Sequence, residues 1–180
     1  LRLEYINGSQ SNEGDTSGKF RIRSSVLGDI VNSSPVIVGT PRYVSYLADA
    51  IDGGLLNDGS SRYEAFKAAN RAEKNNPLDE TEATPPRRPM VYVGANDGML
   101  HGFDANTGIE KFAFVPSAVM ENLYKLPAQA YKGANHQFFV DGTPTVADVY
   151  YDSAWHTVLI GTLRSGGRSL FALDITNPDD

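Results

Sequence analysis

The sequence predicts an all-β fold, a fragment of a β-propeller with four-stranded antiparallel blades, fewer than two of them complete, and short helical insertions. Two observations predict this fold. A set of short strands recurs along the chain, and its inner strands are the continuous apolar runs VYVG and VLIG, which suit strands covered on both faces. A β-sandwich also has short alternating strands, but it does not predict self-similarity strand by strand. The propeller is therefore favoured, with the sandwich as its rival.

The repeat is seen when VYVG (91–94) is set on VLIG (158–161) and LHGFD (100–104) is set on LFALD (170–174). The turn between the two strands is then three residues longer in the second copy, eight residues against five. Each unit also reads as having an upstream strand opened by a proline. Four short antiparallel strands per repeat are typical of a propeller blade.

The upstream strands set Pro35 against Pro144, and a further strand at residues 110–116 completes the first unit. The second unit reaches TNPDD where its fourth strand is expected. A closed propeller needs roughly four to eight blades. We therefore expect this sequence to be part of a longer propeller. The expected division of the partial propeller domain, 1–180, is a lead-in (1–32), a first blade (33–116) with an insertion (41–89), a helical connector (117–135) and a second, incomplete blade (136–180).

The insertion and the connector carry the expected helices. Residues 43–60 read as turn-rich, and Ser61 with Glu64 forms a capping box that predicts a helix to about Lys74. Residues 75–86 are acidic and proline-rich, which predicts a loop. Two interpretations of the insertion remain open, a partner-binding loop and a tolerated surface loop. In the connector, PSAVMENLYKL predicts one helix over 116–126, capped by Ser117.

Composition excludes several functions. The net charge of −6 argues against nucleic acid or an anionic membrane surface as partner, because both need clustered Lys and Arg. No apolar run approaches the roughly 18 residues of a membrane span, so no membrane insertion is expected, and the first residues show no signal-peptide core. The chain has no cysteine, which removes thiol nucleophiles, thiolate metal sites and disulfides.

The densest cluster of polar residues is GANDGMLHGFDANTG, residues 94–108. A calcium loop starting at Asp104 fails, because Gly108 stands where a third ligand is needed and Val115 stands at the twelfth position. Asp97 lies in an Asn-Asp-Gly hairpin turn, and Asp104 opens Asp-x-x-Thr-Gly, where a carboxylate accepts backbone N–H groups. Both aspartates are therefore interpreted as turn residues.

His101 falls on Phe171 in the repeat, so we expect a packed, hydrogen-bonded ring and not a metal ligand. The other two histidines, His136 and His156, are remote in sequence. No G-x-S-x-G motif occurs, and SGGRS (165–169) reads as a flexible hairpin. The sequence predicts no catalytic, cofactor-binding or metal-binding residue in this chain.

Five stretches of this sequence carry a family resemblance: FRIRSSVLGDIVNSSPVIVG, YEAFKAAN, VYVGANDGMLHGFDANTGIEKFAFVPSAV, QFFVDGTPTVADVY and GGRSLFALDITNP. They resemble the C-terminal propeller domain of the PilC/PilY family, type IV pilus biogenesis factors and tip-associated adhesins. The resemblance implies a non-enzymatic module of a Gram-negative surface protein, exported through the periplasm and outer membrane to the pilus tip.

The resemblance also implies partners and roles. Minor pilins, and a host-cell or surface ligand, are the implied partners, and pilus biogenesis, adhesion and twitching motility are the implied roles. Some family members bind calcium in a D-x-D/N-x-D loop of a later blade. No such loop stands in these 180 residues, so calcium is expected only elsewhere in the parent protein.

Two alternative functions stay open. Asp104, Thr107, Gly108 and Phe112 resemble the blade-docking repeat of pyrroloquinoline-quinone dehydrogenases, with Phe112 where tryptophan is usual. The second unit lacks the Thr-Gly pair, since it reads Asp-Ile-Thr-Asn-Pro. The other alternative is a periplasmic scaffold of the outer-membrane assembly type, which is built from similar repeats.

Overall fold

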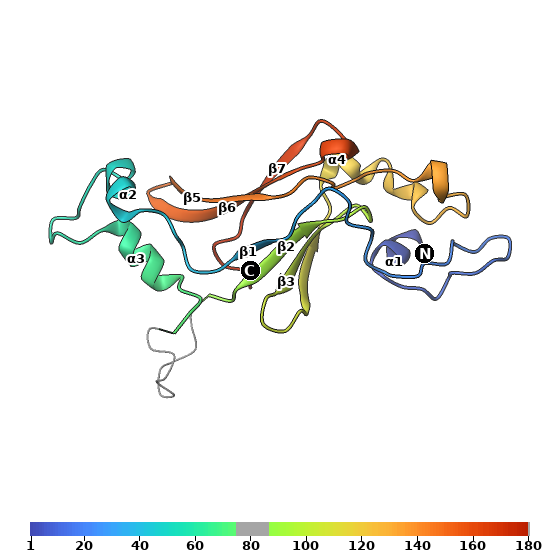
Figure 1. Cartoon of the computed structure of the whole chain (residues 1–180), viewed down its shortest axis with the longest axis horizontal. Helices are drawn as coiled ribbons and strands as arrows, with labels where there is room; N and C mark the ends of the chain where they lie inside the picture. The colour runs from blue at the N-terminus through green and yellow to red at the C-terminus, as the bar shows by residue number, and fades with distance from the viewer. Residues whose placement is uncertain (75–86, 180) are drawn as a thin grey trace.

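The computed structural model describes residues 1–74 and 87–179, and its centre is a pair of antiparallel β-sheets packed face to face (Figure 1). The strand order is β1-β2-β3-β4 in the first sheet and β5-β6-β7 in the second. The prediction of an all-β fold with blade-like antiparallel units is confirmed. The strands are β1 (Val36–Val38), β2 (Met90–Gly94), β3 (Leu100–Asp104), β4 (Glu110–Phe114), β5 (Thr145–Tyr151), β6 (Ala154–Thr162) and β7 (Leu170–Asp174).

The helices are short and lie outside the sheets. They are α1 (Arg2–Ile6), α2 (Ser45–Ile51), α3 (Arg62–Ala69) and α4 (Ser117–Met120), with 3₁₀ turns η1 (Leu123–Lys125), η2 (Gly133–Asn135) and η3 (Arg164–Gly166). The predicted cap of α3 is confirmed, because the Glu64 backbone N–H donates to Ser61 Oγ at 3.3 Å. The expected extent is wrong, since α3 ends at Ala69 with Asn70 as its C-cap. The Asn70 amide bonds the Phe66 carbonyl at 2.9 Å and so closes the last turn.

Two other expectations for helices are also wrong. Residues 43–60, which read as turn-rich, contain α2. The connector holds no single helix over 116–126: α4 begins at Ser117 itself, has Pro116 as its N-cap, and makes no side-chain cap bond. Asn122, a weak helix former, interrupts the helix; its side chain accepts a hydrogen bond from Lys125 Nζ at 2.8 Å, and a 3₁₀ turn follows.

The register of the strands corrects the expected repeat by one residue. Gly94 pairs with Leu100 in the first sheet, and Thr162 pairs with Leu170 in the second. Gly94 is therefore equivalent to Thr162 and not to Gly161, so VYVG corresponds to residues 159–162. VYVG and VLIG look alike as sequences, but successive strand residues point to opposite faces of the sheet. Aligning them with a shift of one residue therefore places every side chain on the wrong face. The proline-opened strands are matched as expected.

The two sheets meet through one face of each. Tyr92 and Leu100 lie on the contacting face of the first sheet, and Leu159 on that of the second; their exposed fractions are 1%, 0% and 0%. Across this contact the Phe114 and Phe171 ring centroids are 5.2 Å apart. Face-to-face packing of consecutive antiparallel sheets is how neighbouring propeller blades bury their apolar residues.

The described part of the insertion leaves the first blade and packs on the second. Tyr63 of α3 and Trp155 of β6 form a second apolar cluster with Ala48 of α2. The Trp155 Nε1–H donates to Asp52 Oδ2 at 2.7 Å. These helices therefore connect the two blades, and Figure 1 shows them at the end of the β5–β6 hairpin. The expected acidic loop at 75–86 lies outside the described residues.

Candidate functional site

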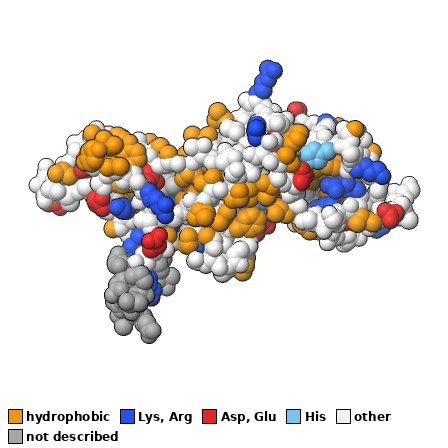
Figure 2. Space-filling view, viewed as in Figure 1, with side chains coloured by type: hydrophobic (Ala, Val, Ile, Leu, Met, Phe, Trp, Pro, Cys, Tyr) orange, Lys and Arg blue, Asp and Glu red, His pale blue; other side chains and the backbone are white. Residues whose placement is uncertain are grey.

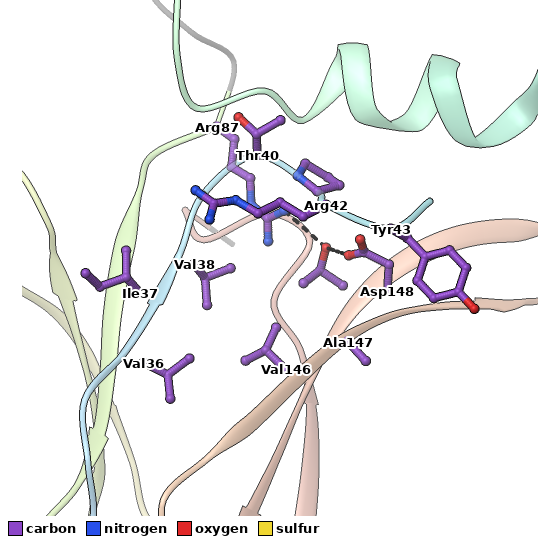
Figure 3. Close-up of a pocket in the computed structure, with 13 residues that line it drawn as sticks. Val36, Ile37, Val38, Thr40, Arg42, Tyr43, Arg87, Val146, Ala147 and Asp148 are labelled. Carbon is purple, nitrogen blue, oxygen red and sulfur yellow. Dashed lines mark hydrogen bonds between the residues drawn. The ribbon is translucent and has the colours of Figure 1, made fainter. Parts of the chain in front are cut away.

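A pocket of about 380 Å³ opens where β1 and β5 approach each other (Figure 3). Apolar side chains of the two strands form one part of its wall, and polar groups from the ends of the insertion form the other. Figure 3 shows Arg42 and Arg87 together at one end of the pocket, away from Val36 and Val146. The lining residues used below are Val36, Val38, Thr40, Arg42, Tyr43, Arg87, Val146, Asp148 and Thr157.

Arg87 is the buried charge of this pocket, with 3% of its surface exposed. Its Nη1 donates to Thr157 Oγ1 at 3.1 Å, and its Nη2 donates to the Ile175 carbonyl at 3.0 Å. Within residues 1–74 and 87–179, Arg87 forms no ion pair with a carboxylate. Burial lowers the pKa of Arg87, and the more distant carboxylate of Asp148 partly opposes that shift.

Both oxygens of Asp148 are already engaged. Thr157 Oγ1 donates to Asp148 Oδ1 at 2.7 Å, and the Tyr63 hydroxyl donates to Oδ2 at 2.7 Å. The same Tyr63 oxygen accepts the backbone N–H of Tyr43 at 2.6 Å. Burial first, and then the neighbouring Asp148, raise the pKa of Tyr63, so this hydroxyl stays protonated as a donor. The network therefore fixes the insertion against β5 and β6.

Arg42 is positioned by the backbone that leaves β1. Thr40 Oγ1 accepts the Ala72 backbone N–H at 2.9 Å, which holds the chain after β1 against the end of the helical part of the insertion. Arg42 is exposed and makes no hydrogen bond or ion pair with the described residues. The pocket lining thus has two guanidinium groups and one carboxylate, whose oxygens already accept hydrogen bonds from Tyr63 and Thr157. Such a set suits binding of an anion better than acid–base chemistry.

Sequence reasoning did not single out Arg42, Arg87, Asp148 or Thr157. One signal was available for the two arginines. They stand at opposite ends of the insertion, which joins neighbouring antiparallel strands, so its ends must lie close together. The contributions of Asp148 and Thr157 depend on how the second blade packs, and no local pattern marks them.

His101 is a buried, hydrogen-bonded ring, as its alignment with Phe171 predicts. It is 4% exposed. Its Nδ1 lies 2.5 Å from Glu110 Oε1 and its Nε2 lies 3.0 Å from Asp97 Oδ2. Burial lowers the pKa of His101, but Asp97 and then Glu110 raise it by more, so the pKa is raised overall. The ring bridges the hairpin turn and the start of β4.

Asp97 and Asp104 serve the turns, as predicted. Asp97 accepts the Met99 N–H at 3.1 Å and, across the chain, the Gly28 N–H at 2.7 Å. Asp104 accepts the N–H groups of the next turn, with the Asn106 nitrogen at 2.8 Å. Arg88, which donates to Asp104 at 2.8 Å, is the largest cause of the lowered pKa of that carboxyl.

Across the described ranges, no three or more His, Asp or Glu side chains are grouped so that they could hold a metal ion. No helix in the same residues is long and apolar enough to cross a membrane. The absence of catalytic, cofactor and metal residues therefore stays a prediction from the sequence, because the structure describes only part of the chain.

Residues 27–180 match the family model of the PilY1 beta-propeller domain. The chain belongs to this family. It is 51% identical over 179 residues to the type IV pilus biogenesis factor PilY1 of Pseudomonas aeruginosa strain UCBPP-PA14, covering 99% of this chain and 13% of that protein. It is 47% identical over 180 residues to a PilY1 homolog of Xylella fastidiosa, with coverages of 99% and 13%.

A solved structure gives the same result. The crystal structure of the Pseudomonas aeruginosa PilY1 C-terminal domain aligns with a TM-score of 0.52 at 48% identity, covering 80% of this chain and 23% of that one. The propeller prediction and the resemblance to the PilC/PilY family are both confirmed. The chain spans about 13% of the length of the curated relatives it matches.

Proposed function

We propose that this segment of the PilY1 beta-propeller family is a non-enzymatic binding module in type IV pilus biogenesis. It acts outside the cell at the pilus tip, where it contacts minor pilins and supports adhesion and twitching motility. Family membership supports the role in pilus biogenesis, since the relatives at 51% and 47% identity bear that name. The observation that carries the binding role is an exposed apolar surface on α2.

The α2 surface consists of Tyr46, Leu47 and Ile51, whose exposed fractions are 73%, 44% and 52%. Figure 2 shows hydrophobic side chains gathered at the end of the molecule that carries α2, as well as over the central sheets. Large apolar side chains that cluster on a surface mark sites of protein–protein contact. The inward residue of the same helix, Ala48, is fully buried, so α2 is held in place while its outer face is left free.

The test replaces Tyr46, Leu47 and Ile51 by glutamine in the bacterium that encodes the chain. The matched control replaces Leu1, Leu3 and Ile22, which are 74%, 71% and 57% exposed elsewhere on the surface. We expect the α2 variant, at normal protein level, to reduce surface pili and twitching, and the control to leave both unchanged. Normal piliation in the α2 variant would contradict the binding role.

Mass spectrometry of filaments sheared from the same cells tests the location. Peptides of this chain together with pilins support the pilus tip. Recovery only from the soluble periplasm would favour the outer-membrane assembly scaffold. Visible absorbance of a bound quinone in the purified protein would favour the quinoprotein. In that case Asp104, Thr107, Gly108 and Phe112 would belong to its blade-docking repeat.

A further inference from the structure

We propose that the pocket between β1 and β5 binds a carboxylate group through Arg42 and Arg87. The buried guanidinium of Arg87 is the first support. Within the part of the chain that the structure describes, its side chain makes two hydrogen bonds, which use two of the five N–H groups that an arginine offers, and both acceptors are neutral. A buried charge without an ion-pair partner is costly, and a bound carboxylate would offset that cost.

The second support is Arg42, which lines the same pocket from the opposite end of the insertion and has no partner among the described residues. Among the described residues, the lining contains these two arginines and one acid, Asp148, which together carry one net positive charge. Among the described residues, Asp148 accepts hydrogen bonds from Tyr63 and Thr157 and forms no ion pair with Arg42 or Arg87. This local positive charge contrasts with the net charge of −6 on the whole chain.

The apolar part of the pocket wall indicates which kind of anion would fit. Val36, Val38 and Val146 place apolar surface opposite the two guanidinium groups (Figure 3). The volume of about 380 Å³ lies in the lower part of the range for small-ligand sites, roughly 300–1,000 Å³. A fork of N–H donors fits the two oxygens of a carboxylate. The ligand class is therefore a carboxylate on a short apolar stem, either a free small acid or an acidic residue among apolar residues of a peptide.

Calorimetric titration tests this assignment with two matched pairs of probes. The first pair is 3-methylbutanoate and its uncharged analogue 3-methylbutanamide. The second is an end-blocked tetrapeptide with one glutamate between apolar residues, and the same peptide with glutamine. We expect binding of an acid and no binding of its amide. Tighter binding of the acidic peptide would identify a peptide as the source of the carboxylate, and tighter binding of the small acid would identify a metabolite.

Fluorescence gives a second readout. Trp155 is the only tryptophan in the chain, and its ring centroid lies 6.2 Å from that of Tyr43, which lines the pocket. A bound ligand that moves Tyr43 changes the surroundings of this indole. We expect the emission to change with acid concentration along the same curve as the calorimetric heat.

Arg42→Gln is the decisive variant, because Arg42 is exposed and its loss leaves the folded network of Arg87 intact. We expect at least about tenfold weaker binding, the effect of losing a hydrogen bond to a charged group. Arg168→Gln removes the same charge from the β6–β7 turn and should bind like the unaltered chain. Arg87→Lys keeps the buried charge but loses the fork, and should also weaken binding.

The proposal is overturned by any of three results. These are equal binding of acid and amide, equal weakening by Arg42→Gln and Arg168→Gln, or no binding of any probe up to about 10 mM.

Discussion

Leu100 and Leu170 occupy equivalent positions at the start of the third strand in the two blades, yet one is fully buried and the other is 70% exposed. Leu100 lies on the face that packs against the second sheet. Leu170 lies on the corresponding face of the second sheet, beside Ile160, which is 43% exposed. Both blades have leucine at this position. The apolar residue therefore predicts the position within the blade, but it does not predict whether the face that carries it is covered by another sheet.

The opposite faces show the complementary difference. In the second blade, Leu159 and Phe171 face the first sheet; Leu159 is buried in the shared core and Phe171 packs against that core. At the position of Phe171 the first blade has His101, which is hydrogen-bonded to the carboxylates of Glu110 and Asp97. The same strand position therefore carries a side chain that packs between blades in the second unit and one that forms hydrogen bonds in the first.

The largest expected effect on stability is the difference between alanine substitutions of Leu100 and of Leu170. Leu100→Ala should lower the free energy of unfolding by about 3 kcal/mol, the usual cost of removing a buried leucine side chain. Leu170→Ala should change it by less than about 0.5 kcal/mol, as for other exposed positions. Urea denaturation of the two variants measures both. Similar losses would contradict the difference in burial between the two leucines.

The next largest effect on stability tests the corrected alignment of β6 with β2. Gly161 lies opposite Phe171, and an added Cβ would meet that ring at 2.1 Å. The equivalent pair in the first blade is Val93 with His101, a larger residue facing a smaller ring. Gly161→Val should therefore cost about 2 kcal/mol through overpacking. Adding Phe171→Leu should recover part of this loss in the same denaturation assay; no recovery would argue against the pairing.

Replacing His101 with the residue of the second blade is expected to have a smaller effect. His101→Phe should leave the fold intact and cost about 1 kcal/mol, because charge-assisted hydrogen bonds to Asp97 and Glu110 are lost. The folded-state pKa of His101 is raised above 6.5, so its contribution is fully present below about pH 6.5 and is lost as the pH rises through the folded pKa. The difference in unfolding free energy between the unaltered protein and the His101→Phe variant should therefore shrink as the pH rises. A difference that grows with pH would contradict this assignment.

The smallest effect concerns Asp174, the equivalent of Asp104. Burial raises its pKa, but hydrogen bonds from Thr176, Tyr151 and His156 lower it by more, to about 2. Its contribution is present above the ordinary value of 3.8 and is lost as the pH falls toward about 2. Because the side chain is partly exposed, Asp174→Asn should cost only about 0.5 kcal/mol at pH 7. Acid titration of both proteins should show the difference vanish near pH 2; a constant difference would exclude the carboxylate as its cause.

The strands could be predicted from the sequence because their signals are local. Prolines open β1 and β5, and Asn-Asp-Gly marks the turn between β2 and β3. The role of His101 was also accessible, since the repeat supplied a second example of its position. The register of β6 was not, because apolar letters alone do not say which face a residue occupies.

Longer-range packing explains what the sequence did not show. Helix α2 has Val44 at its N-cap and no side-chain cap bond, so no local signal marks its start. It is stabilised by burying Ala48 against the cluster of Tyr63 and Trp155. The pocket is likewise a product of packing, because Arg87 meets Thr157 only when the second blade is in place.

The attachment of the insertion to the second blade has a mechanical consequence. Separating the two sheets would expose Tyr63 and Trp155 to water and break the Tyr63–Asp148 and Trp155–Asp52 hydrogen bonds together. Tension applied across the blades is therefore shared between the main chain of the connector and these side chains. Under pulling, we therefore expect the two blades to resist as one unit and to separate in one step.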